Sequence, residues 1–220
     1  MRRIGVVIPA GGSGLRMGGQ LKPFLLLAGK SVLERAVAPF LERKDVVAIV
    51  IVLPATETST AVTDPRVRIV AGGRERSDSV RAGLDALGDS VDLVVIHDAA
   101  RPLVSREVID RVIAAAVDGG AIAALPASDT IHEVDADAIV RTPDRARLWQ
   151  AQTPQAFPRA LITNAHLRAL EDGIPATDDA ALVVRYGGTV RVVPGDPVNL
   201  KLTRPEDLPA AEALLRARGQ

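Results

Sequence analysis

Residues 4–17 read Ile4-Gly5-Val6-Val7-Ile8-Pro9-Ala10-Gly11-Gly12-Ser13-Gly14-Leu15-Arg16-Met17, an apolar run followed by a glycine-rich loop. The apolar part is typical of a buried strand, which Pro9 ends because proline has no backbone N–H for the neighbouring strand. The glycines lack a Cβ, so backbone N–H groups of the loop can close around an anion. In open α/β sheets, nucleotides bind beyond the carboxyl ends of the strands. The stretch therefore predicts an α/β fold with a phosphate site after its first strand.

This loop differs from the two common phosphate-binding motifs. No Gly-Lys-Ser/Thr follows the glycines, as it would in a P-loop. Met17 stands where the dinucleotide fingerprint has its third glycine. The alternative is a tight strand-to-helix turn that binds nothing. Arg16 and Lys22 favour the phosphate site, because a plain turn has no need of two cations.

Length and composition limit the possible functions. The 220 residues suffice for one α/β domain, residues 1–220, with a substantial core. Lys and Arg balance Asp and Glu at 27 each, so charge gives no argument for nucleic acid or an anionic membrane as partner. The absence of cysteine excludes thiol catalysis, disulfides and cysteine-ligated metals.

The sequence also predicts a cytoplasmic location. No segment approaches the ~20 apolar residues of a membrane helix. The N-terminus resembles an export signal only superficially, because Gly5 and Pro9 interrupt its short apolar part and more cations follow. We therefore expect a protein that is neither exported nor inserted in a membrane.

Apolar runs and helix-start signals alternate along the chain. Strands that alternate with helices of this length predict a doubly wound, mostly parallel, Rossmann-like sheet. The expected strands cover residues 4–8, 46–53, 67–70, 93–96, 121–125 and 190–193. The expected helix starts are Ser31 with Glu34, Ser77, Ser105, Pro158, Asp178, and Thr203 with Glu206, the two Ser/Thr–Glu pairs having capping-box spacing.

Residues 129–147 break this alternation. They show no helical period and contain two short extended pieces, 130–134 and 138–141, around Asp135-Ala136-Asp137. This pattern predicts a β-hairpin inserted in the α/β fold. An isolated two-stranded hairpin is marginal in water, so it should pack on something. It is either an ordinary surface excursion or an arm that embraces a second subunit.

Three further loops at expected strand ends carry polar side chains. In residues 72–79, glycines allow close backbone approach, and Ser77 or Ser79 would be able to bond a base or sugar if it does not simply cap a helix. Asp98 follows a very apolar run, which suits a magnesium-bound phosphate as well as it suits a salt-bridged aspartate. Lys201 precedes an expected helix and alone would be a surface lysine. The adjacent His97 is expected to be structural.

These loops and the hairpin contain spaced motifs that together resemble one enzyme family. The motifs are Pro9-Ala10-x-Gly12-x-Gly14-x-Arg16-Met17, Lys22-x-Phe24, His97-Asp98-Ala99-Ala100-Arg101-Pro102, Asp129-Thr130, Asp144-Arg145 with Leu148-Trp149, Thr153-Pro154-Gln155 and Lys201-x-Thr203-Arg204-Pro205-Glu206-Asp207. They resemble the cytidylyltransferases that act on small polyol phosphates. The likeness is greatest to those whose acceptor is 2-C-methyl-D-erythritol 4-phosphate, and it extends from about residue 4 to residue 215.

The resemblance implies transfer of CMP from CTP to this acceptor, with release of pyrophosphate, in the non-mevalonate isoprenoid pathway. It implies Mg²⁺ bound with the CTP phosphates, and a homodimer formed through the arm at 129–147. The residues that it implies as catalytic are Arg16, Lys22, Arg145 and Lys201. Those that it implies as substrate-binding are Pro9, Ala10, Gly11, Gly12, Gly14, Gly73, Ser79, Asp98, Ala99, Arg101 and Thr130, with Asp98 also facing the metal.

The implied roles separate a donor side from an acceptor side. Arg16 and Lys22 would hold the triphosphate of CTP. Thr130, Arg145 and Lys201 would position the acceptor's phosphate, the first two on an arm from the other subunit. General chemistry agrees, because a phosphate monoester with a second pKa of ~6 is already ionised and needs no general base. The reaction needs cations that reduce repulsion between two polyanions, and losing one should lower the rate on the order of 10²–10³-fold.

Two departures from the family pattern are visible. Gly11 stands where the family more often has alanine, which should leave the loop intact. Lys22 precedes Pro23, whereas the family usually has proline before this lysine, so we expect a slightly different backbone setting there.

Other functions remain open at the level of sequence. Ribitol 5-phosphate or another polyol phosphate as acceptor would leave residues 9–24 unchanged, and an enzyme for another base is a more distant alternative. A non-catalytic nucleotide-binding module would keep the glycines but lose the cations, which are present here. A glycosyltransferase would need Asp-x-Asp at a strand end, whereas Asp135-x-Asp137 falls in the expected hairpin turn.

Overall fold

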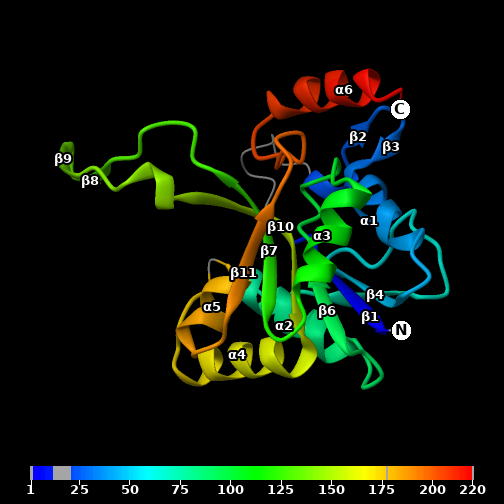
Figure 1. Cartoon of the computed structure of the whole chain (residues 1–220). Coiled ribbons are helices and arrows are strands. Elements are labelled where there is room, and N and C mark those ends of the chain that lie inside the picture. Colours follow the sequence, from blue (N-terminus) through cyan, green and yellow to red (C-terminus); the bar gives the residue numbers. More distant parts are fainter. Residues whose placement is uncertain (1, 12–20, 177, 220) are drawn as a thin grey trace.

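The computed structural model describes residues 2–11, 21–176 and 178–219, and these form a seven-stranded sheet with helices on both faces (Figure 1). The strand order is β11-β7-β10-β6-β1-β4-β5. The neighbours β6, β1, β4 and β5 are parallel, as are β7 and β11, while β10 runs antiparallel to β6 and β7. The strands are β1 (Ile4–Pro9), β4 (Val46–Leu53), β5 (Val67–Ala71), β6 (Leu93–Ile96), β7 (Gly120–Pro126), β10 (Trp149–Pro158) and β11 (Val190–Pro194).

Both faces of the sheet are buried, which confirms the doubly wound architecture. Successive side chains of a strand point to opposite faces. In β1, Val6 and Ile8 pack in the core that contains α1 and α3, whereas Val7 packs in the core that contains α2, α4 and α5. This explains why the central strands are uninterrupted apolar runs. The helices are α1 (Val32–Leu41), α2 (Arg76–Ala86), α3 (Arg106–Ala115), α4 (Arg159–Glu171), α5 (Asp179–Arg185) and α6 (Asp207–Ala217).

Three of the expected helix starts are confirmed in detail. Ser31 and Glu34 form the predicted capping box, with the Glu34 N–H donating to the Ser31 hydroxyl over 3.1 Å and the Ser31 N–H donating to the Glu34 carboxylate over 2.7 Å. Ser105 accepts from a backbone N–H of α3, and Asp178 accepts from one of α5. These side chains satisfy N–H groups that have no partner within their helix.

The expectations for the other helix starts need correction. The helix α2 begins at Arg76 rather than Ser77, and the Asp78 carboxylate accepts from the N–H of the preceding Glu75 over 2.9 Å. The capping box of Thr203 and Glu206 is wrong: Thr203 donates its N–H and hydroxyl to Asp207 over 2.6 and 3.0 Å. The helix α6 therefore starts at Asp207, and Pro205 lies before it. Pro158 likewise precedes α4 instead of lying in its first turn.

The longest strand, β10, was not among the expected strands. It contains the polar residues Gln152, Thr153 and Gln155, which break the apolar pattern although they are buried. Their partners come from distant parts of the chain: the Gln155 amide donates to Asp178 over 2.6 Å. Buried polar groups are tolerated when they are hydrogen-bonded, and the apolar period of a sequence does not reveal such partners.

The inserted hairpin is present and projects away from the sheet (Figure 1). Its strands are β8 (Glu133–Asp135) and β9 (Ala138–Arg141), and both are exposed along their whole length. Ala136 makes the turn with a φ of 53°. A second small hairpin, β2 (Leu26–Leu27) with β3 (Lys30–Ser31), packs in a separate apolar cluster with α6. Within the described ranges, no helix combines the length and apolar character needed to cross a membrane.

Candidate active site

A pocket of about 380 Å³ opens at the carboxyl ends of β1 and β6. Within the sheet, β4 is the neighbour of β1 on one side. The neighbour of β1 on the other side is β6, which comes later in the chain. Such a reversal of strand order leaves a crevice above the strand ends, where open α/β sheets bind their ligands. The residues that line the pocket are Pro9, Ala10, Gly11, Lys22, Pro23, Gly73, Arg74, Glu75, Arg76, Ser79, Asp98, Ala99, Ala100, Lys201, Leu202 and Thr203.

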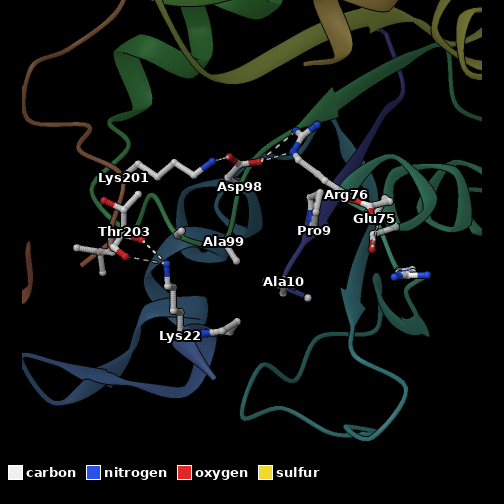
Figure 2. A pocket seen from close by; sticks show the side chains of 16 residues that line it. Pro9, Ala10, Lys22, Glu75, Arg76, Asp98, Ala99, Lys201 and Thr203 are labelled. Carbon is white, nitrogen blue, oxygen red and sulfur yellow. Dashed lines mark hydrogen bonds and ion pairs between the residues drawn. The ribbon is translucent and has the colours of Figure 1, made fainter. Parts of the chain in front are cut away.

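Asp98, two residues after the end of β6, is held between two cations (Figure 2). Its Oδ2 accepts from Lys201 Nζ over 2.6 Å, and its Oδ1 lies 3.1 Å from both Nε and Nη2 of Arg76. Burial by itself would raise the pKa of the Asp98 carboxyl, but the charges of Arg76 and Lys201 outweigh burial and hold that pKa well below its usual range. The pocket therefore contains a carboxylate that is ionised at neutral pH.

The backbone beside Asp98 is fixed by a chain of hydrogen bonds through buried groups. The Asp98 N–H donates to the Thr153 hydroxyl over 3.0 Å, and that hydroxyl lies 3.0 Å from Nδ1 of His97. The other ring nitrogen of His97 lies 3.1 Å from the Arg101 carbonyl oxygen. Burial lowers the pKa of His97 to about 4, so the ring is neutral, donates from Nε2 and accepts at Nδ1. The geometry makes His97 a part of the framework, as the sequence suggested.

Lys22 approaches the same pocket from another part of the chain. It begins the short 3₁₀ turn η2 (Lys22–Phe24), and its Nζ donates to the Thr203 carbonyl oxygen over 3.1 Å (Figure 2). Lys201 lies two residues before Thr203, so this loop brings both lysines to one wall of the pocket. Two ammonium groups beside one pocket suit a ligand with several phosphates.

Glycines shape the wall opposite these lysines. A Cβ added to Gly73 would lie 2.3 Å from the Asp78 Cβ, and one added to Gly72 would lie 2.6 Å from the Ser79 hydroxyl. Only glycine therefore fits between this loop and the start of α2. The result is a stretch of accessible backbone beside Ser79, as a binding site for a base or sugar requires.

Nine of the residues that the sequence singled out line this pocket. They are Pro9, Ala10, Gly11, Lys22, Gly73, Ser79, Asp98, Ala99 and Lys201. Gly12, Gly14 and Arg16 lie outside the described residues. The pocket therefore brings together the four loops that were expected to carry the chemistry.

Arg101, Thr130 and Arg145 lie elsewhere. The guanidinium of Arg101 is buried behind the pocket and donates to the Asn199 carbonyl oxygen over 2.7 Å. Thr130 and Arg145 are exposed on the projecting arm, where Arg145, in the 3₁₀ turn η3 (Arg145–Arg147), donates to the Ser128 carbonyl oxygen over 2.7 Å. Within one chain, the arm does not place them in the pocket.

Two residues that organise the site, Arg76 and Thr153, had no role predicted from the sequence. Arg76 stands in the expected glycine-rich loop, yet its partners, Asp98 and Asp179, lie far away in the chain. Thr153 belongs to a motif that was noted only for its resemblance to the family. A cation at the start of a helix beside a glycine-rich loop is the one signal in the sequence from which a role of Arg76 could have been predicted, and it was not used.

The carboxylates of the pocket fit a magnesium ion that is held mainly by its substrate. Mg²⁺ usually binds through one or two carboxylates, with phosphate oxygens and water as its other ligands. Asp98 supplies such a carboxylate at the pocket wall. Across the described part of the chain there is no cluster of three or more His, Cys, Asp or Glu side chains that would hold a metal without a substrate. Asp98 would therefore fit a magnesium ion that binds together with a nucleotide substrate.

Comparison with known proteins agrees with this geometry. The family model described as 2-C-methyl-D-erythritol 4-phosphate cytidylyltransferase matches residues 4–217. The protein of that name from Symbiobacterium thermophilum is 48% identical over 218 residues, which cover 96% of this chain and 92% of the relative. The one from Syntrophus aciditrophicus is 43% identical over 225 residues, covering 97% and 96%. The crystal structure of 2-C-methyl-D-erythritol 4-phosphate cytidylyltransferase from Thermus thermophilus superposes with a TM-score of 0.84 at 36% identity, covering 98% of this chain and 100% of that one. The chain therefore belongs to the 2-C-methyl-D-erythritol 4-phosphate cytidylyltransferase family.

Proposed function

We propose that the pocket between β1 and β6 is the place where this chain joins the CMP part of CTP to 2-C-methyl-D-erythritol 4-phosphate. By its family, the chain is a CTP-dependent cytidylyltransferase of the non-mevalonate isoprenoid pathway. The assignment of the site rests on the Asp98 carboxylate, which lies between Arg76 and Lys201. This carboxylate lines the pocket at the reversal of strand order, together with Gly73. The cytoplasmic location stays a prediction from the sequence.

The reaction exchanges one P–O bond for another. An oxygen of the acceptor's phosphate attacks the α-phosphorus of CTP, the bond from that phosphorus to the oxygen bridging the α- and β-phosphates breaks, and pyrophosphate leaves with that electron pair. The attacking phosphate is ionised at neutral pH, because its second pKa is ~6, so no side chain has to remove a proton. The work of the protein is to hold two polyanions together in line.

The two lysines divide this work. Lys22 lies on the pocket wall opposite the glycines and would bind the triphosphate of CTP and the departing pyrophosphate. Lys201 is 43% exposed while paired with Asp98, so it is accessible to the acceptor's phosphate from the solvent side. Arg76 then stays as the cation on Asp98. Arg16, predicted from the sequence to bind the triphosphate, keeps that role in this proposal.

Mg²⁺ completes the donor site in this proposal, with Asp98 as its protein ligand. When bound with CTP, the ion would neutralise charge on the phosphates and on the leaving pyrophosphate. Asp98 can serve because its carboxylate remains ionised. Lys201 would have to leave Oδ2 of Asp98 for the ion to reach that oxygen, which fits a lysine that turns to the acceptor.

The arm fits a role in a homodimer. Its outer surface carries exposed apolar side chains, Ile131, Val134, Ile139, Val140 and, beside the arm, Trp149. Apolar side chains gathered on a projecting hairpin mark an interaction surface, because water does not favour their exposure. A second copy of the chain is the partner that would also bring Thr130 and Arg145 to the pocket.

The acceptor is tested by measuring magnesium-dependent pyrophosphate release from CTP. We expect turnover with 2-C-methyl-D-erythritol 4-phosphate and little with ribitol 5-phosphate under the same conditions. Turnover of ribitol 5-phosphate alone would overturn the proposed acceptor. Release with neither compound would overturn the assignment of the reaction to this chain.

The arm is tested by subunit complementation. Arg16→Ala and Arg145→Ala chains should each be inactive as homodimers, and their mixture should recover part of the wild-type activity. Recovery is expected because a heterodimer then contains one pocket with an intact Arg16 and an Arg145 from the partner. A mixture that stays as inactive as its components contradicts the proposed arm.

A further inference from the structure

We infer that Asp179 and His166, which lie behind the pocket, are positioning residues that orient Arg76 and, through it, the Asp98 carboxylate. The inference rests on the role proposed above for Asp98. It concerns a buried line of contacts that runs from α4, on one face of the sheet, to the carboxyl end of β6.

Each contact in this line is short and direct. His166 Nε2, on α4, lies 2.9 Å from Asp179 Oδ1. The other oxygen of Asp179 lies 2.8 Å from Nη1 of Arg76. The opposite edge of the same guanidinium, Nε and Nη2, meets Asp98 Oδ1 at 3.1 Å. The planar guanidinium thus joins two carboxylates, one in the pocket and one behind it (Figure 2 shows the Asp98 side).

Asp179 is a buried charge whose partners in the described structure are Arg76 and His166. Its side chain is 0% exposed and that of His166 is 1% exposed. Although burial alone raises the pKa of Asp179, Arg76 and His166 hold it below the usual range, so the residue is an ionised carboxylate in the interior. A buried charge is costly unless it is paired.

The start of α5 does not need Asp179. Its neighbour Asp178 is the residue that caps this helix, accepting from the Ala181 N–H over 2.9 Å. The buried Gln155 fixes the same turn, because its amide donates to Asp178 and its carbonyl oxygen accepts from the Ala180 N–H. Because Asp178 and Gln155 already accept hydrogen bonds from the N–H groups at the start of α5, the carboxylate of Asp179 is not needed there and contacts Arg76 instead.

The charges of the groups around Arg76 explain how Asp179 and His166 would affect the Asp98 carboxylate. Asp98 and Asp179 carry one negative charge each, and Arg76 and Lys201 carry one positive charge each, so the four groups are neutral together. When Lys201 leaves Asp98 for the acceptor's phosphate, Arg76 alone holds the carboxylate. Its direction then depends on Asp179, whose own plane is set by the hydrogen bond that His166 donates.

The test compares variants by CTP binding and by steady-state pyrophosphate release. Asp179→Asn keeps the size of the side chain and removes its charge; it should lower kcat/KM for CTP on the order of 10²-fold, as expected for a misplaced group at the reaction centre. In an Arg76→Met background the same substitution should cause no further loss, because the residue acts through Arg76.

His166 provides a second pair of variants. His166→Leu removes the donor and should lower kcat/KM by roughly tenfold, the value of one hydrogen bond to a charged group. His166→Gln places an amide N–H near the former Nε2 and should stay within about threefold of the wild type. The control is Ile162→Ala, also buried on α4 but in the apolar core, which should lower the melting temperature and leave kcat/KM unchanged.

Two results would overturn the inference: wild-type kcat/KM in folded Asp179→Asn, or an equal further loss in the Arg76→Met background. If Asp179→Asn does not fold, the His166 variants decide, and equal activity of the Leu and Gln forms contradicts the positioning role. Measuring the affinity for CTP separately from turnover distinguishes a failure of this inference from a failure of the proposed acceptor. A wild-type chain that binds CTP without using the acceptor refutes the proposed acceptor, whereas unchanged CTP affinity and turnover in the variants refute the positioning line.

Discussion

The pH dependence of stability tests the neutral, buried histidine beside the site. Burial lowers the pKa of His97 from 6.5 to about 4, against the hydrogen bond to the Arg101 carbonyl oxygen. Between those two pH values, the unfolded chain binds a proton that the folded chain excludes. The contribution of His97 to stability is therefore complete above about pH 6.5 and falls as the pH drops toward about 4.

The size of the effect follows from the same two values. Linkage gives a loss of about 2 kcal/mol between pH 7 and pH 5 from this one residue. For a chain of this length the loss corresponds to a decrease in melting temperature of roughly 4–8 °C. Asp98 and Asp179 have lowered pKa values, so their losses come at lower pH, below the ordinary carboxyl value of 3.8.

The assay is urea unfolding at pH 7 and pH 5 for the wild type and His97→Gln. The variant keeps a donor for the Arg101 carbonyl oxygen but has no group that titrates in this range. We expect the wild type to lose about 2 kcal/mol more than His97→Gln between the two pH values. His132→Gln, which replaces an exposed histidine of the arm, is the matched control for the loss of a histidine outside the core. Equal losses in the wild type and His97→Gln would refute the reasoning.

Three other perturbations have defined outcomes. Gly73→Ala puts a Cβ 2.3 Å from that of Asp78, and this overpacking should raise the KM for CTP by roughly tenfold in the pyrophosphate assay; an unchanged KM would mean that the wall is not in contact with the nucleotide. Ile139→Asp puts a charge on the exposed face of the arm and should shift the protein to monomers in sedimentation analysis with loss of turnover, whereas an active dimer contradicts the arm's role. Chelation by EDTA should abolish turnover and added Mg²⁺ should restore it; full activity in EDTA would exclude the proposed ion.

Much of the sheet could be predicted because its information is local. A strand buried on both faces is usually an uninterrupted apolar run, and β4 and β6 have the bounds that their apolar runs indicated. The capping box at Ser31 likewise involves residues three apart in the chain. Locality was not always sufficient, because Thr203 is paired with Asp207 and not with the expected Glu206.

Features that depend on distant partners could not be predicted in this way. The strand β10 contains buried glutamines whose hydrogen-bond partners, such as Asp178, are many residues away in the sequence. The pairing of Asp98 with Lys201 joins residues 103 positions apart, and no period or spacing contains that information. The motifs indicated that both residues matter, whereas the bridge from Arg76 to Asp179 came only from the fold.

The central claim is that Lys201, which is paired with Asp98 in the structure, binds the acceptor's phosphate in a cytidylyl-transfer site. The most direct measurement is the rate at which Lys201→Met and wild type form 4-diphosphocytidyl-2-C-methyl-D-erythritol from CTP and 2-C-methyl-D-erythritol 4-phosphate, followed by ³¹P NMR. We expect a decrease on the order of 10²–10³-fold in a variant that remains folded. A folded Lys201→Met variant that forms this product at the wild-type rate would contradict the claim.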